Sequence, residues 1–281
     1  MRTLSIRLIV LLFAGCLGGC SFLYSYRNIE RAIRWQLDDY VSWTSTQDQQ
    51  LHDRLVAQLR WHRDTQLPRY RDWLMQLRDE LRGPIELSQL QKHADEIRQF
   101  WQDGMAQAAP DIAAQLADLS DAQVRDLIAT MREQQGDVES EYNDMTPQEL
   151  INKRSRSLRK SVQYWMGSLD KTQLAAVDAW AAALPDGRVQ WLASRRRWTD
   201  AFERALAARH QADKFNAAIQ QLFVQPQENW DPGYQEIEQR NERSMLTLLA
   251  QLHNAANDKQ REAEARRIDQ WLEHIDQLAA H

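Results

Sequence analysis

The sequence predicts an all-α protein, a multi-helix bundle of antiparallel helical hairpins, and three observations support this fold class. Only 9 glycines and 7 prolines occur among 281 residues, whereas β-rich folds need many glycine-containing turns. Apolar residues recur with helical spacing, and no segment shows a comparable strict alternation. Five segments also carry a helix-start pattern, in which Ser, Thr or Asp precedes Gln or Glu by three residues.

This start pattern is the capping box, in which two side chains satisfy backbone amides of the first helical turn. The capping side chain accepts from an amide three residues later, and the Gln or Glu side chain accepts from the capping residue's own amide. The five pairs are Thr44 with Gln47, Ser88 with Gln91, Ser120 with Gln123, Thr146 with Glu149, and Asp170 with Gln173. Together with the apolar periodicity, these pairs predict helices that start near Ile29, Gln47, Pro68, Gln89, Asp121, Pro147, Lys171, Arg188, Asp213, Tyr234 and Asp258. Some neighbouring helices of this set are expected to be joined into one.

Helical faces with the spacing i, i+3, i+4 and i+7 predict which side chains form the core. Turn signals at Gly83-Pro84 and at 185–187 separate neighbouring helices, and the longer segment 224–233 is a candidate boundary between two lobes. The clearest faces are Val124, Leu127, Ile128 and Met131; Leu174, Val177, Ala181 and Leu184; Met245, Leu248, Leu249 and Leu252; and Ile268, Trp271, Leu272, Ile275 and Leu278.

The first residues predict an export signal. Arg2 and Arg7 make its start positive, and the apolar run 8–14 is too short to span a membrane, which takes about 20 residues. Leu17-Gly18-Gly19 directly before Cys20 resembles the lipobox of bacterial lipoproteins. The resemblance implies cleavage before Cys20 and acylation of this cysteine with fatty acids such as palmitate.

Two alternatives to acylation at Cys20 remain. Phe13-Ala14-Gly15-Cys16 is a weaker lipobox, and an ordinary secretory signal would leave Cys20 as a free thiol. Two or more acyl chains anchor a protein stably in a membrane. In lipoproteins of this type, a residue other than aspartate after the cysteine, here Ser21, implies sorting to the outer membrane with the protein facing the periplasm.

The predicted organisation is therefore a signal peptide at 1–19, an acylated and membrane-proximal segment at 20–45, and a helical domain at 46–281. The membrane is the expected partner of the acylated end. Aromatic side chains suit the polar boundary of a bilayer, and Phe22, Tyr24, Tyr26 and Trp35 of this segment are expected there. Most of the 11 tryptophans are expected in the core, because each can bury a large area.

Catalytic and metal-binding patterns are missing from the sequence. No histidine has an acidic residue three positions before it, and no two histidines stand four apart. There is no Gly-x-Ser-x-Gly motif and no glycine-rich phosphate loop. The net charge of −5 at pH 7 also argues against nucleic acid as a partner. We therefore expect no enzyme, no cofactor and no metal site.

One candidate binding surface is Arg195-Arg196-Arg197, which lies between Trp191 and Trp198 on an expected helix. Consecutive helical residues point about 100° apart, so the three arginines cannot form one flat patch. One or two of them could bind anionic lipid head groups or phosphates. The others would be ordinary solvated arginines.

An acidic block and a basic block lie on consecutive expected helices. If these helices form a hairpin, the blocks face each other, either as a surface with many salt bridges, which we favour, or as a bipolar groove for a charged partner. The acidic block is Glu133, Asp137, Glu139, Glu141 and Asp144, and the basic block is Lys153, Arg154, Arg156, Arg159 and Lys160.

The N-terminal region resembles a family of proteobacterial lipoproteins that carry a domain of unknown function. The motifs that carry the resemblance are Leu37-Asp38-Asp39-Tyr40, the Thr-x-x-Gln start at Thr44, Trp61-His62-Arg63, and Leu67-Pro68-Arg69-Tyr70. Glu30, Arg31 and Trp43 depart from the family pattern. The resemblance implies the compartment and the anchor and no known activity.

A second resemblance is to the Spy/CpxP-type periplasmic chaperones, which are all-helical and independent of ATP. It lies in the helix starts Leu87-Ser88-x-x-Gln91, Leu119-Ser120-x-x-Gln123 and Leu169-Asp170-x-x-Gln173. We expect a binding or scaffolding factor that contacts envelope proteins, with a holdase chaperone as the alternative. The oligomeric state stays open.

Overall fold

The computed structural model describes residue 26 and residues 28–279. The predicted signal peptide, Cys16, Cys20, Phe22 and Tyr24 lie outside the described residues. Within the described range every regular element is a helix and there is no β-strand, which confirms the all-α multi-helix class.

The helices begin within two residues of every predicted start, and six of them begin at the predicted residue itself. A π-helix, η1, joins two of them, and a 3-10 helix, η2, occupies part of the segment 224–233. The elements are α3 (Ile29–Asp38), α4 (Ser45–Trp61), η1 (His62–Gln66), α5 (Leu67–Glu80), α6 (Leu87–Ala117), α7 (Asp121–Asp144), α8 (Pro147–Met166), α9 (Lys171–Ala183), α10 (Arg188–Ala207), α11 (Ala212–Val224), η2 (Pro226–Asn229), α12 (Pro232–Asn254) and α13 (Asp258–Ala279).

Four of the five predicted capping boxes are confirmed, at the starts of α4, α7, α8 and α9. The box predicted at Ser88 is wrong, because Glu86 caps α6 and forms the box with Gln89. The physical reason is a distant partner. Asn254 accepts from the backbone amide of Ile85 at 2.8 Å and donates to its carbonyl at 3.0 Å, which fixes the chain directly before Glu86.

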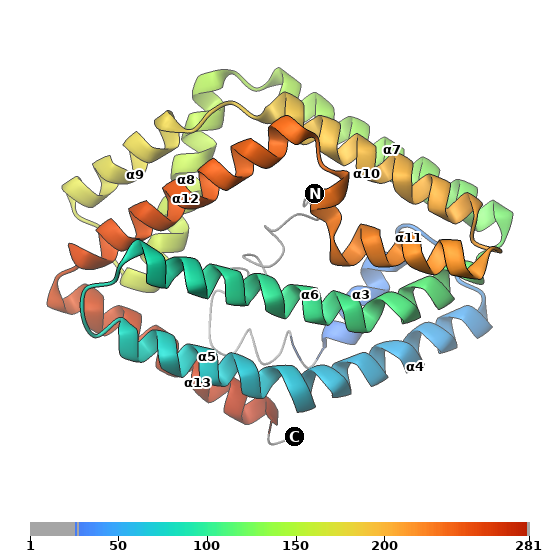
Figure 1. The fold of residues 1–281 in the computed structure, drawn as a ribbon, viewed down its shortest axis with the longest axis horizontal. Helices are drawn as coiled ribbons and strands as arrows, with labels where there is room; N and C mark the ends of the chain where they lie inside the picture. Colours follow the sequence, from blue (N-terminus) through green and yellow to red (C-terminus); the bar gives the residue numbers. More distant parts are fainter. Residues whose placement is uncertain (1–25, 27, 280–281) are drawn as a thin grey trace.

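The helices form a triangular arrangement when viewed down the shortest axis of the molecule (Figure 1). The continuous rod of α4, η1 and α5 follows the lower edge, and α13 packs against α5. Helix α6 runs through the centre and contacts α4, α11 and α12. Helices α12 and α10 form the two upper sides, with α9 packed on α12 and α7 on α10.

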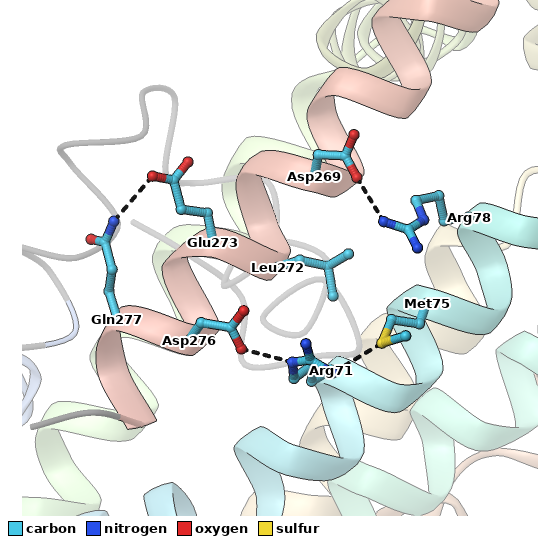
Figure 2. A pocket seen from close by; sticks show the side chains of 8 residues that line it. All are labelled: Arg71, Met75, Arg78, Asp269, Leu272, Glu273, Asp276 and Gln277. Carbon is cyan, nitrogen blue, oxygen red and sulfur yellow. Dashed lines mark hydrogen bonds and ion pairs between the residues drawn. The ribbon is translucent and has the colours of Figure 1, made fainter.

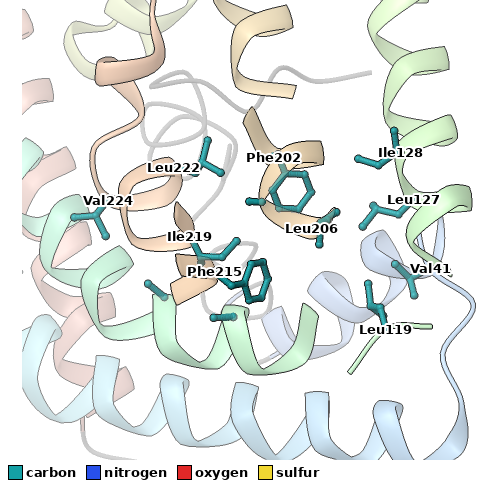
Figure 3. Packing of buried hydrophobic residues seen from close by; sticks show 13 residues of the cluster. Val41, Leu119, Leu127, Ile128, Phe202, Leu206, Phe215, Ile219, Leu222 and Val224 are labelled. Carbon is teal, nitrogen blue, oxygen red and sulfur yellow. The ribbon is translucent and has the colours of Figure 1, made fainter. Parts of the chain in front are cut away.

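The largest cluster of buried apolar side chains joins α6, α7, α10 and α11 (Figure 3). Phe215, Ile219 and Leu206 are its most deeply buried large members. A second cluster joins α5, α6 and α13, and includes Leu67, Trp271 and Ile275. Both clusters bring together helices far apart in the sequence, so the bundle closes through long-range packing.

The capping glutamines of α4 and α7 bind each other. The side-chain nitrogen of Gln123 donates to the side-chain oxygen of Gln47 at 2.8 Å and to the carbonyl of Ser42. The nitrogen of Gln47 donates to the side-chain oxygen of Gln123 at 3.2 Å and to the carbonyl of Asp118. Each glutamine oxygen also accepts from the capping residue of its own helix, so both amides use several of their donors and acceptors.

The same arrangement joins α9 to α13. Gln173 and Gln260 exchange amide hydrogen bonds of 3.0 and 2.8 Å, and Gln260 also donates to the carbonyl of Ser168. Gln260 belongs to a capping box with Asn257 that the sequence analysis missed, although its Asn-x-x-Gln spacing was visible. Both glutamines are almost fully buried.

A further link ties the α12–α13 turn to the turn before α6. His253 is buried, with Nδ1 2.9 Å from the Glu264 carboxylate and Nε2 2.9 Å from the carbonyl of Gly83. Burial by itself lowers the pKa of His253, but the hydrogen bonds to Glu264 and Gly83, together with the charge of Glu264, raise it above its usual value despite Arg261 nearby. A protonated imidazole donates to both acceptors at once.

Replacing one member of the buried glutamine pair should destabilise the fold. In Gln173→Ala, the buried amide of Gln260 loses a partner, and we expect a loss of about 1–3 kcal/mol in the free energy of unfolding, measured by urea denaturation. The exposed Gln148→Ala is the matched control and should change stability by less than about 0.5 kcal/mol. Equal effects of the two variants would refute the role given to the pair.

The His253 link predicts a stability that falls as the pH rises. Because the folded chain raises the pKa of His253, its contribution is complete below the unfolded pKa of about 6.5 and is lost as the pH passes the folded pKa. Thermal unfolding of the natural chain and of His253→Gln between pH 5.5 and 9 measures this. The stability advantage of the natural chain over the variant should shrink with rising pH, and a constant difference would contradict the link.

Candidate functional site

The π-helix η1 interrupts an otherwise continuous rod at the motif that carries the family resemblance. Its defining bond runs from the amide of Leu67 to the carbonyl of His62, five residues back. Pro68 follows directly, and a proline inside a helix has no amide to donate and crowds the carbonyl four residues before it. A wider turn relieves this conflict, and the Thr65 hydroxyl donates to the carbonyl of Trp61 at 2.7 Å. Single π-turns inside α-helices are frequent at functional sites.

The π-turn places His62 in a row of aromatic rings. The hydroxyl of Tyr26 lies 2.8 Å from Nδ1 of His62, and the two ring centroids are 5.7 Å apart. On its other side, His62 meets the ring of Tyr70 edge-on at 5.4 Å, and Tyr70 contacts Phe100 at 4.8 Å. We name Tyr26, His62, Tyr70 and Phe100 the aromatic row.

The electrostatics of the aromatic row favour neutral side chains. Burial lowers the pKa of His62 to about 4, so the imidazole is uncharged at neutral pH and its Nδ1 can accept from the Tyr26 hydroxyl. Burial raises the pKa of Tyr26 and of Tyr70 to about 12. A general base needs a pKa near the working pH, so this arrangement suits docking of the N-terminal segment better than proton transfer.

Tyr26 is partly buried and packs against the core cluster of α5, α6 and α13. Trp35, in contrast, is 73% exposed and is the most exposed aromatic side chain among the described residues. Sequence reasoning could not find the docking of Tyr26, although Pro68 inside a helical pattern was a signal for an irregular turn.

The candidate binding surface on α10 is divided among different neighbours. Arg196 forms two hydrogen bonds of 2.6 Å with Glu139 of α7. Arg197 lies 3.8 Å from Asp231. Arg195 stands over the ring of Trp191, with its guanidinium carbon 5.3 Å from the ring centroid.

Trp198, the remaining member of this predicted surface, is held by the core of the α10–α11 hairpin. Its indole nitrogen donates to the carbonyl of Leu222 at 3.0 Å, and its ring stacks on Phe202 with centroids 5.2 Å apart. The structure therefore brings together Trp191 and Arg195 but directs Arg196, Arg197 and Trp198 elsewhere.

The acidic and basic blocks do not face each other across a hairpin, because α7 packs along α10 instead of folding back on α8. Lys153 pairs with Glu141 at 2.7 Å. Arg159 pairs with Asp178 of α9, and Arg154 donates to the carbonyls that follow α9. Among the described residues the two blocks therefore share one ion pair, Lys153 with Glu141, while Arg159 and Glu139 pair with other helices.

A groove with a volume of about 610 Å³ lies between α5 and α13 (Figure 2). Two ion pairs join the two helices here, Arg71 with Asp276 at 2.7 Å and Arg78 with Asp269 at 3.1 Å. In the described part of the chain, no three or more His, Cys, Asp or Glu side chains come together as metal ligands. None of the described helices is long and apolar enough to cross a bilayer.

Fold and site define an all-α protein whose helix starts are joined by capping glutamines and in which Tyr26 docks beside a π-turn. The chain belongs to the family of unknown function DUF6279, whose model matches residues 39–235. The match includes η1 and α10 and leaves out Tyr26 and α13. The searches of curated proteins and of solved structures find no match.

His62, which is partly buried and neutral, predicts a loss of stability in acid. Its pKa is about 4 in the folded chain against 6.5 ordinarily, so below pH 6.5 the unfolded chain takes up the proton first. The free energy of unfolding should therefore decrease from pH 6.5 to 4, by up to about 3 kcal/mol. Urea unfolding of the natural chain and of His62→Phe over this range measures the effect.

The exposed His210 supplies the control for this measurement. His210→Gln should keep the acid sensitivity of the natural chain, whereas His62→Phe should lose most of the His62 contribution. Parallel profiles for the natural chain and His62→Phe would show that His62 titrates normally.

Proposed function

We propose that the protein is a lipid-anchored, periplasm-facing lipoprotein that acts as a binding or scaffolding factor for envelope proteins. The lipobox-like Leu17-Gly18-Gly19-Cys20 supports the anchor. The observation that carries the scaffolding role is the docking of Tyr26, six residues after Cys20, on His62. A chain held this close to its anchor keeps a fixed end of the helical body near the membrane.

A binding role without covalent chemistry agrees with the surface charges. Along α5–α13 and α7–α10, the arginines pair with carboxylates of the neighbouring helix. Such paired charges stabilise the packing of the helices only modestly but keep a long polar surface regular. Extended helical faces of this kind suit recognition of other proteins.

A holdase chaperone is the alternative. The Leu-Ser-x-x-Gln start at Ser120 and the Leu-Asp-x-x-Gln start at Asp170 support it, because both form capping boxes. A holdase needs exposed apolar surface to bind unfolded chains. Trp35, Val56 and Val189 are the large apolar side chains exposed in the described part, and they lie on three different helices, so we favour the scaffold.

Replacing Cys20 tests the anchor. Cys20→Ser should release the protein from the membrane fraction to the soluble periplasmic fraction, because the acyl chains supply the membrane affinity. Fractionation and mass spectrometry of the N-terminal peptide measure this, with Cys16→Ser as the matched control that should stay membrane-bound. An unlipidated Cys20 peptide in the natural chain would refute the anchor.

Crosslinking in cells then separates scaffold from chaperone. The anchored protein should crosslink to one or a few envelope proteins, and it should not slow the aggregation of an unfolded client at tenfold excess. Protection of the client without ATP would favour the holdase, and a featureless crosslinking pattern would count against the scaffold.

A further inference from the structure

Arg195 is the arginine of the triplet that lacks an anionic partner. Arg196 is neutralised by Glu139, and Arg197 lies 3.8 Å from Asp231. Among the described residues, no carboxylate lies within ion-pair distance of Arg195, and its buried Nε has no hydrogen-bond partner. A guanidinium offers five donors; the buried Nε of Arg195 is out of reach of a ligand, but the four donors on its two terminal nitrogens make no hydrogen bond among the described residues.

The guanidinium of Arg195 lies over one ring of an aromatic pair. That ring belongs to Trp191, and it contacts the ring of Tyr142 with centroids 4.7 Å apart. Lys153 lies over the ring of Tyr142, with its ammonium 4.4 Å from the ring centroid. Lys153 is paired with Glu141, so its charge is already compensated and Arg195 is the uncompensated cation of the group.

The surroundings increase the tendency of Arg195 to bind an anion. Burial lowers the pKa of Arg195, whereas Tyr142, Tyr40 and Glu139 act on it in the opposite direction. Glu139, the one carboxylate among these groups, already binds Arg196 with both oxygens. A cation beside aromatic rings and away from bulk water attracts an anion more strongly than a solvated one.

We propose that Arg195, which lies over Trp191, binds a carboxylate side chain of a protein partner at the seam between α7 and α10. A single planar guanidinium matches the two oxygens of a carboxylate. A phosphate site would need further donors, and here Lys153 and Arg196 are already paired. Arg, Trp and Tyr are also the residues that most often dominate protein interfaces.

This inference deepens the proposed binding role and rests on it for the nature of the partner. The ligand chemistry itself does not depend on acylation of Cys20. Fractionation of Cys20→Ser tests the anchor, and titration with a carboxylate ligand tests the Arg195 site. Either hypothesis can therefore be refuted without the other.

The test uses the full-length chain in detergent, labelled with 5-fluorotryptophan, and follows the ¹⁹F resonance of Trp191, which W191F assigns. At constant ionic strength, N-acetylglutamate amide should shift this resonance with saturation, and the uncharged N-acetylglutamine amide should not. R195Q should weaken the apparent affinity at least tenfold, because it removes the charge and the planar pair of donors. R195K keeps the charge and should bind more weakly than the natural chain.

Arg197→Gln is the matched control, because it removes the same charge from the neighbouring residue on another face. It should leave the titration unchanged, and circular dichroism checks that each variant is folded. Equal shifts with the acid and the amide, an unchanged titration in R195Q, or a response to inorganic phosphate alone would each overturn the proposal. Retention of all crosslinked envelope partners by R195Q in cells would overturn the protein-partner assignment while leaving the anchor intact.

Discussion

The structure depends on helix caps that also serve as tertiary contacts. In an ordinary capping box, the Gln side chain satisfies one amide of its own helix and leaves its nitrogen free. Here those nitrogens reach a second capping glutamine, so Gln47 meets Gln123 and Gln173 meets Gln260. Gln47 and Gln123 are 76 positions apart in the sequence, and Gln173 and Gln260 are 87 positions apart. The side chains that cap the helix starts therefore also join distant parts of the chain. Local helix formation and the long-range arrangement are thus fixed by one set of amides.

This coupling explains which features the sequence predicted. A capping box is complete within four residues, so the starts of α7, α8 and α9 could be predicted, and the apolar faces predicted the burial of Val177, Leu252 and Ile268. The pairing of the boxes needs the three-dimensional approach of two helix starts, which no local pattern contains. The error at Ser88 has the same origin, because Asn254, far along the chain, decides where α6 begins.

The candidate site could be predicted only in part. The motif around His62 was visible, and so was Pro68, but the π-turn results from the competition between a proline ring and the packing of the rod on both sides of it. Spacing correctly excluded a flat patch at 195–197, since consecutive helical residues diverge. The ion pair between Glu139 and Arg196 could not be predicted from the sequence, because α7 was expected to pack on α8, whereas it packs on α10.

The two ends of the molecule separate the proposed anchor from the proposed partner site. Figure 1 shows α5 and α13 along one edge and α7 and α10 along the opposite edge. Tyr26 packs against the core cluster of α5, α6 and α13, so the anchor proposed at Cys20 would hold that edge near the bilayer. Arg195 and Trp191 lie on α10 at the other edge, where a partner can approach without competing with the membrane. A rigid body is required for this separation, and the paired capping glutamines connect the helices between the two edges.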